Sequence, residues 1–278
     1  MHVSKIDCRT QDAPSEFTKS LHQSGFAILQ QHPIDSQLLS DVYQGWETFF
    51  ADESKHDFLF DPETQDGFFP FRSENAKGST VKDLKEFYHY YPWGKCPDHL
   101  KAKTQALYQQ LSQLSGQLLG WVENECPNEV SNKFSMHLKD MIDESSGTLM
   151  RILNYPALQG NEETNAIRAA AHEDINLLTC LVASTEPGLQ VLDLQGNWLD
   201  VDTDPGNITV NVGDMLQLCS DHYFPSTTHR VINPLNSRAN TARLSIPMFL
   251  HPRPEVVLSD QHTSGSFLEE RLKEIGLK

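Results

Sequence analysis

The chain has few cysteines and no long apolar run. Its cysteines are odd in number and show no Cys-x-x-Cys spacing: Cys8, Cys96, Cys126, Cys180 and Cys219. We interpret them as reduced thiols of a cytoplasmic protein, because disulfide frameworks and zinc sites need paired spacings. No run approaches the length of a membrane span, about 18 apolar residues. The first residues also lack the basic and then apolar pattern of a signal peptide.

Basic residues are scarce as well. The chain has 22 Lys and Arg against 38 Asp and Glu, which gives a formal net charge of −16. Nucleic-acid binding needs clustered positive charge, so this balance argues against that class of partner. The mean hydropathy of −0.47 indicates a soluble protein, for which neither a membrane nor a nucleic acid is an expected partner. Nothing in the sequence predicts an oligomeric state.

The first half of the chain alternates helical and strand patterns. Residues 15–22 begin an amphipathic helix, 25–29 read as a short buried strand, and Asp35 can cap a second helix. Residues 52–80 are rich in Gly, Pro, Asp and Ser and predict a loop. Aromatic residues then predict a strand over 83–91.

The clearest helix covers residues 98–123. Its apolar side chains form one stripe: Leu100, Leu107, Leu111, Leu114, Leu118 and Val122. We expect this helix to lie across the outside of a sheet.

From residue 147 the pattern changes to short β runs. They cover 148–154, 177–183, 188–194, 198–201, 207–218, 228–232 and 242–250. Turn residues separate them, notably at Gly196-Asn197 and at 204–207. We therefore predict an α+β, mainly β fold with a double-stranded β-helix core of the jelly-roll or cupin kind. Residues 1–125 would form an N-terminal helical and β segment that buttresses a core formed by 126–278, the two making one fused unit.

Two histidines and one aspartate suggest a metal centre. Residues i and i+2 of a strand point to the same face, so His172 and Asp174 can hold one ion from one side. His229 begins a second strand-like run, 57 residues after His172. A His-x-Asp pair alone is a weak signal, but two histidines and a carboxylate are the ligand set of the non-haem Fe(II) facial triad.

Arg243 and Ser245 have the same i and i+2 spacing. An arginine fork binds a carboxylate in two places, and a serine hydroxyl adds a further hydrogen bond. The pair therefore predicts a site for one end of a dicarboxylate such as 2-oxoglutarate.

Six motifs, in order and at these distances, resemble one known family. They are Arg151-Ile152-Leu153-Asn154-Tyr155-Pro156, Ala171-His172-Glu173-Asp174-Ile175-Asn176, Gly188-Leu189-Gln190-Val191, Val210-Asn211-Val212-Gly213-Asp214, Thr228-His229-Arg230-Val231 and Arg243-Leu244-Ser245-Ile246-Pro247. The family is the Fe(II)/2-oxoglutarate-dependent dioxygenases, in the isopenicillin-N-synthase-like branch. The long loop between His229 and Arg243 is similar to that of bacterial members.

The resemblance implies the roles of the residues. His172, Asp174 and His229 would bind Fe(II), and Arg243, Ser245 and Tyr155 would bind 2-oxoglutarate. With O2, and with ascorbate as a reductant, decarboxylation of 2-oxoglutarate to succinate would drive hydroxylation or desaturation of a small-molecule substrate. No catalytic residue beyond the metal ligands is implied.

Three other functions remain open from the sequence. In a 2-oxoglutarate-independent oxidase of the isopenicillin N synthase type, Arg243 and Ser245 would bind the substrate carboxylate directly. A metal-stabilised binding protein is disfavoured because every ligand position is filled. A zinc hydrolase is disfavoured because it would need a general base and no carboxylate clamp.

The substrate pocket is predicted only in outline. Its candidates are Arg72, Phe87, Tyr88 and Phe224, with Phe68, Phe69 and Tyr90 as further aromatic residues near loops. We expect His251 to have a hydrogen-bonding role. Asp221-His222 and Arg238 are expected at the surface.

Overall fold

The computed structural model describes residues 2–74, 81–201, 204–234 and 240–274. Its helices are α1 (Ala13–Ser24), α2 (Ser36–Ala51), the 3-10 helix η1 (Glu53–Phe58), α3 (Asp98–Glu125), α4 (Asn128–Ser131), α5 (Leu138–Met141), α6 (Asp214–Cys219) and α7 (Ser264–Glu274). Its strands are β1 (Lys5–Asp7), β2 (Phe26–Gln30), β3 (Gly67–Phe69), β4 (Glu86–Tyr90), β5 (Leu149–Tyr155), β6 (Ala169–His172), β7 (Leu178–Val182), β8 (Leu189–Leu192), β9 (Trp198–Asp200), β10 (Ile208–Val212), β11 (His229–Val231) and β12 (Arg243–Phe249). Within these ranges no helix is long and apolar enough to cross a membrane.

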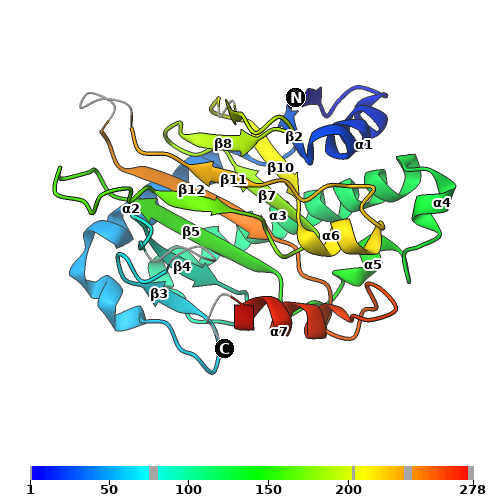
Figure 1. Cartoon of the computed structure of the whole chain (residues 1–278). Coiled ribbons are helices and arrows are strands. Elements are labelled where there is room, and N and C mark those ends of the chain that lie inside the picture. The colour runs from blue at the N-terminus through cyan, green and yellow to red at the C-terminus, as the bar shows by residue number, and fades with distance from the viewer. Residues whose placement is uncertain (1, 75–80, 202–203, 235–239, 275–278) are drawn as a thin grey trace.

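Two sheets form the centre of the molecule (Figure 1). The larger has eight strands in the order β1-β2-β10-β7-β12-β5-β4-β3, and the smaller has four in the order β6-β11-β8-β9. From β5 onward the chain passes back and forth between the two sheets, as in a double-stranded β-helix, with β8 and β9 as a hairpin within the smaller one. The predicted mainly β jelly-roll fold is therefore confirmed.

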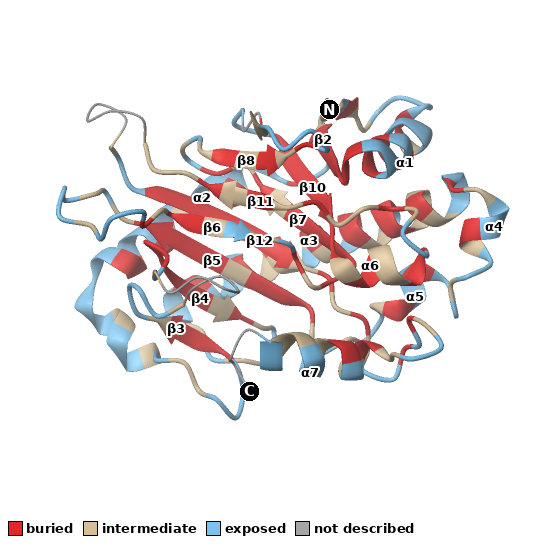
Figure 2. Cartoon of the chain, viewed as in Figure 1, coloured by how far each residue is buried: buried red, intermediate tan, exposed pale blue. Residues whose placement is uncertain are grey.

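The three long helices α1, α2 and α3 pack on the outer face of the larger sheet. The leucine stripe of α3 joins one apolar cluster with Cys180 of β7 and Ile246 of β12, and Ser115 of α3 lies 3.3 Å from the Cys180 sulfur. Figure 2 shows the strands between the helices and the smaller sheet as mostly buried. The expected position of the long helix, across the outside of the sheet, is thus found.

The N-terminal part of the chain contributes to both edges of the larger sheet. β2 pairs with β10 at one side, and β4 pairs with β5 at the other. The boundary predicted between residues 125 and 126 therefore does not divide the sheet, and the two-segment division stays a prediction.

Most predicted elements are present, with two corrections. The run at 207–218 is a strand only to Val212, after which Gly213 ends the ladder and α6 begins. The segment 52–80 was predicted as loop, yet its described part contains η1 and β3. The first error arises because a short apolar run fits a buried strand and a short helix equally well. The second arises because turn-forming residues flank the short elements η1 and β3.

All five cysteines are free in the structure, as their spacing predicts. Asp35 caps α2 as predicted, since its side chain accepts from the backbone N–H groups of Gln37 and Leu38.

Candidate active site and metal centre

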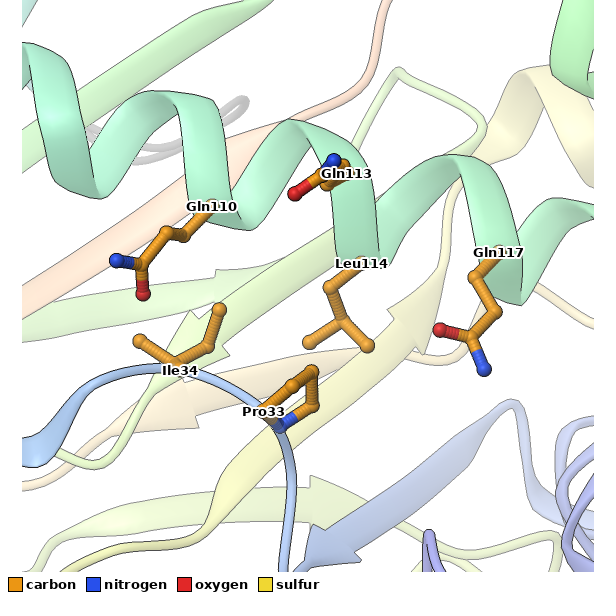
Figure 3. A pocket seen from close by; sticks show the side chains of 6 residues that line it. All are labelled: Pro33, Ile34, Gln110, Gln113, Leu114 and Gln117. Atoms are coloured by element: carbon orange, nitrogen blue, oxygen red, sulfur yellow. The ribbon is translucent and has the colours of Figure 1, made fainter.

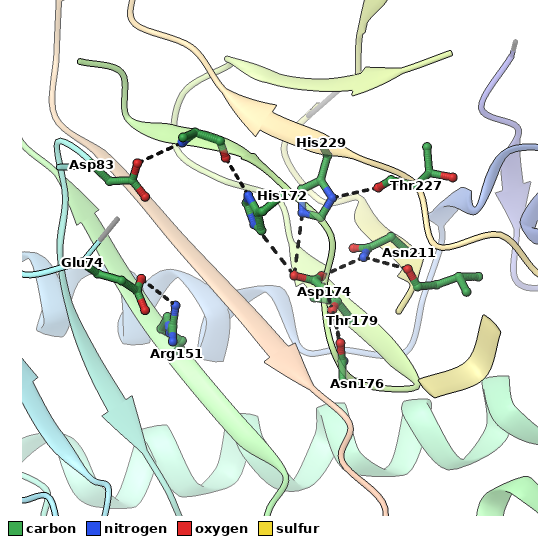
Figure 4. A network of polar contacts seen from close by, with 12 residues as sticks. Glu74, Asp83, Arg151, His172, Asp174, Asn176, Thr179, Asn211, Thr227 and His229 are labelled. Carbon is green, nitrogen blue, oxygen red and sulfur yellow. Dashed lines mark hydrogen bonds and ion pairs between the residues drawn. The ribbon is translucent and has the colours of Figure 1, made fainter. Parts of the chain in front are cut away.

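Three potential metal ligands meet between the two sheets. β6 ends at His172, which is paired in register with His229 at the start of β11. Asp174 follows two residues later, in the turn after β6 and not on a strand. One ligand atom of each residue lies within 4.8 Å of the others. Asp174 Oδ1 is 3.9 Å from His172 Nε2 and 3.8 Å from His229 Nε2, as Figure 4 shows.

Backbone carbonyl groups orient both imidazoles. His172 Nδ1 lies 2.7 Å from the carbonyl oxygen of Ala170, and His229 Nδ1 lies 3.2 Å from that of Thr227. A carbonyl only accepts, so each Nδ1 carries the proton. Each Nε2 is therefore left as a lone-pair donor for a metal ion.

The two oxygens of Asp174 have separate tasks. Oδ2 accepts from Thr179 Oγ1 at 2.5 Å and from Asn211 Nδ2 at 2.8 Å. Thr179 is on β7 and Asn211 on β10, and they are partners in the ladder. Because Oδ2 is saturated by these donors, Oδ1 is the oxygen that faces the two histidines.

A close backbone approach holds the turn that carries Asp174. The Asp174 carbonyl accepts from Asp214 N–H at 2.7 Å. A Cβ on Gly213 would stand 2.2 Å from the Asn176 carbonyl oxygen. Only glycine allows the end of β10 to come this close, so residue 213 positions the carboxylate from outside the site.

The protonation states suit a divalent cation. Burial, helped by the charge of His229, lowers the pKa of His172 to about 4. Burial alone would raise the pKa of Asp174, but the two histidines and the hydrogen bonds from Asn211 and Thr179 lower it. Neutral imidazoles and an ionised carboxylate are the donor set of non-haem Fe(II), so these residues fit that metal.

A carboxylate clamp lies on the same side of the larger sheet. Arg243 is 1% exposed, its Nε donates to the Glu186 carbonyl at 2.9 Å, and its Nη2 donates to Ser184 Oγ at 2.8 Å. Its Nη1 is buried with no partner among the described residues. Tyr155 is the register partner of Arg243, and Ser245 follows two residues on, so both share this face. An anion that accepts a hydrogen bond from Nη1 would supply the missing partner of this arginine. A carboxylate of 2-oxoglutarate fits this requirement.

The predicted pocket residues separate into two groups. Phe87 lies on the inner face with Leu153 and Tyr155. Tyr88 and Phe224 lie instead in the cluster that packs against the helices, and the Tyr88 ring centroid is 4.9 Å from that of Trp46. Tyr88 lies there because adjacent strand positions point to opposite faces, and a contact of either residue with the substrate stays a prediction.

The other pocket candidates follow the same alternation. Phe68 and Tyr90 also belong to the helix-side cluster, whereas Phe69 packs with the inner one. Arg72 is exposed, and its guanidinium carbon lies 5.3 Å from the Phe71 ring centroid.

The minor sequence candidates are also located. Asp221 is exposed and pairs with Lys133 at the surface. Burial lowers the pKa of His251 to about 4. Arg238 lies outside the described residues.

The sequence reasoning missed a charged cluster on the inner face. Lys85 lies 2.8 Å from Glu74 and 2.9 Å from Asp83, and Arg151 lies 3.3 Å from Glu74. Asp83 also accepts from Ala170 N–H at 3.0 Å, beside the carbonyl that holds His172. Figure 4 shows Glu74, Arg151 and Asp83 of this cluster together with the triad. The signal was the i+4 spacing of Arg151 and Tyr155, which gives them one face of β5.

A hollow of about 300 Å³ lies elsewhere, on the helical side (Figure 3). Its lining residues are Pro33, Ile34, Gln110, Gln113, Leu114 and Gln117. None of them titrates, so this hollow is no part of the metal centre.

Comparisons with known proteins agree with this geometry. Residues 147–252 match the 2OG-Fe(II) oxygenase superfamily, and residues 4–112 match the N-terminal region of non-haem dioxygenases in morphine synthesis. A provisionally described oxygenase of known structure from Shewanella oneidensis is 50% identical over the full length of both chains, with a TM-score of 0.90.

Two characterised relatives are more distant. A 2-oxoglutarate-Fe(II) type oxidoreductase, hxnY, from Emericella nidulans is 27% identical over 86% of this chain and 74% of its own. Isopenicillin N synthase from Streptomyces griseus is 26% identical over 91% of this chain and 83% of its own. The chain therefore belongs to the 2OG-Fe(II) oxygenase superfamily and is an oxidoreductase, with a His-Asp-His site that fits Fe(II).

Proposed function

We propose that the enzyme couples decarboxylation of 2-oxoglutarate to the hydroxylation or desaturation of a small molecule. His172, Asp174 and His229 would hold Fe(II), which when bound supplies the activation of O2. Arg243, Ser245 and Tyr155 would bind the distal carboxylate of 2-oxoglutarate. The observation that carries the proposal is the buried, unpartnered Nη1 of Arg243 on the sheet face that also supports the triad.

The sheet register supports a metal-binding end and a carboxylate-binding end on the inner face of the larger sheet. Asn211, Thr179 and Phe249 form one row across β10, β7 and β12, and this row supports Asp174. Arg243 and Tyr155 form another row at the opposite end of β12. The co-substrate would therefore lie over β12, on the line between the two rows, with the long Arg243 side chain extending toward it from one end.

The substrate would bind beside this line, over β3, β4 and β5. Phe69 and Phe87 stack with centroids 4.3 Å apart, and the Arg151 guanidinium lies 4.6 Å from the Phe87 centroid. Arg151 Nε donates to His89 Nε2 at 3.0 Å. Burial, together with the charge of Arg151, holds the pKa of His89 well below its ordinary value, so this ring is a neutral acceptor.

These groups favour one chemical class of substrate. Stacked rings bind planar, unsaturated molecules, and a guanidinium binds a carbonyl or carboxylate oxygen. Because Glu74 already balances the charge of Arg151, a neutral carbonyl compound would suffice. We therefore propose a small planar substrate with at least one carbonyl group.

A second candidate function is oxidation without 2-oxoglutarate. The similarity to isopenicillin N synthase favours it, and it would use the same clamp for a substrate carboxylate. Ascorbate would serve either reaction as a reductant that keeps the metal as Fe(II).

One experiment separates the two candidates. Fe(II) and then 2-oxoglutarate are added anaerobically to the apoprotein, and the visible charge-transfer band of the chelate is recorded. We expect a band in the wild type and a loss of affinity in Arg243→Met. Aerobic succinate release with a set of planar carbonyl compounds then finds the substrate, with Arg151→Met as the variant expected to raise its KM. If Fe(II) binds but no band forms, the proposal fails and the 2-oxoglutarate-independent oxidase replaces it.

A further inference from the structure

A second arginine, Arg168, is buried near the clamp. It directly precedes β6, and its side chain is 1% exposed. Its Nη2 donates to the Thr241 carbonyl at 2.6 Å, which ties it to the segment just before Arg243. Its Nε is buried without a partner among the described residues, as is the Nη1 of Arg243.

Three other buried or half-buried cations differ in one respect, because each pairs with a carboxylate. Lys85 and Arg151 pair with Glu74, and Lys55 pairs with Glu86 at 3.0 Å. In the described ranges Arg168 and Arg243 form no ion pair with any carboxylate. Two buried guanidinium groups that lack a counter-ion are costly, and among the described residues neither Arg168 Nε nor Arg243 Nη1 has a hydrogen-bond partner.

The pKa shifts of Arg168 and Arg243 indicate that the two arginines lie near each other. Burial lowers the pKa of Arg168, and the charge of Arg243 lowers it further. Tyr155 and, to a smaller extent, Glu186 oppose this effect on both arginines. Among the described residues, Glu186 bonds to Arg243 only through its backbone oxygen and forms no ion pair with either arginine. An anionic ligand would remove the remaining imbalance.

We propose that Arg168 is a second cationic residue of the co-substrate site, whose free Nε, with the free Nη1 of Arg243, binds the distal carboxylate of 2-oxoglutarate. This inference rests on the proposed 2-oxoglutarate dependence. A carboxylate has enough lone pairs to accept from both guanidinium groups and from Ser245. The site would then select 2-oxo acids that carry a distal carboxylate over those that end in a methyl group.

The test compares two ligands under anaerobic conditions. The dissociation constants of 2-oxoglutarate and 2-oxopentanoate, which has a methyl group in place of the distal carboxylate, are measured from the charge-transfer band of the Fe(II) protein. We expect Arg168→Met to weaken 2-oxoglutarate binding about tenfold or more, since a hydrogen bond to a charged group is lost. Binding of 2-oxopentanoate should change less than about threefold, because it makes no such bond.

Two further variants make the result decisive. Arg9→Met removes the same charge from an exposed residue and should change neither constant. Arg168→Gln keeps an amide donor and replaces the Met variant if that protein does not fold. Unchanged 2-oxoglutarate affinity, or equal weakening of both ligands, overturns the role of Arg168. A wild type that shows no band with 2-oxoglutarate would instead overturn the proposed function itself.

Discussion

Asp174 shows how one side chain is divided between structure and chemistry. Its Oδ2 is held by Thr179 and Asn211, and its Oδ1 faces the two histidines. A carboxylate that is fixed at one oxygen presents the other at a defined angle. Loss of such a supporting hydrogen bond typically lowers metal affinity by about 10- to 100-fold.

Removing one of these bonds should weaken iron binding without unfolding the protein. We expect Thr179→Val to reduce Fe(II) affinity about tenfold, within the range found for supporting residues. The side chain keeps its volume, so the loss reports orientation. The measurement is an anaerobic competition titration with a coloured chelator. Thr209→Val, a buried threonine one strand away on β10, is the control and should leave affinity unchanged.

At the scale of elements, the site depends on how closely β10 approaches the turn after β6. The contact between Gly213 and the Asn176 carbonyl leaves no room for a side chain. The same contact lets Asp214 N–H bind the Asp174 carbonyl. The close packing of the end of β10 against this turn therefore helps to position the metal ligand Asp174.

A methyl group on residue 213 should push the end of β10 away from the turn after β6. We expect Gly213→Ala to lower the free energy of unfolding by about 2–3 kcal/mol, a typical cost of overpacking, and to weaken Fe(II) binding as well. Gly120→Ala in α3 meets no atom within 4 Å and should stabilise the helix by about 0.5–1 kcal/mol. Urea unfolding of both variants checks the contrast. Equal effects of the two substitutions would contradict it.

The sequence predicted the elements better than it predicted which face each residue occupies. Two-residue spacing brought His172 and Asp174 together, although Asp174 lies beyond the strand and reaches the metal centre from a turn. The same alternation directs Phe87 inward and Tyr88 outward. The sequence alone, however, could not show which of the alternating β4 residues face the interior of the β core. Arg168 escaped notice because only the tertiary structure brings the residue before β6 next to the start of β12.

At the scale of the whole molecule, acid sensitivity should concentrate in the inner charged cluster. Burial would raise the pKa of Glu74, but the charges of Arg151 and Lys85 hold it far below its ordinary value. A depressed carboxyl pKa contributes stability above the unfolded pKa, which is about 4.3 for glutamate, and loses it as the pH falls further.

The variant Glu74→Gln tests this assignment. We expect it to lower the free energy of unfolding by about 2–3 kcal/mol at pH 7. The difference from the wild type should shrink steadily as the pH falls below about 4.3. Glu53→Gln, at a side chain that is 96% exposed, should match the wild type throughout. Denaturant unfolding over a pH series gives the curves, and a difference that stays constant with pH would exclude the linkage.

The alternation along β4 and β5 has a consequence for how such enzymes diversify. Outward residues such as Tyr88 pack against the helices, and inward residues such as Phe87 and Arg151 lie on the face where we propose that the substrate binds. The two sets interleave along the same strands yet meet different neighbours. A lineage can therefore acquire new substrates by replacing every second residue while the scaffold is inherited intact.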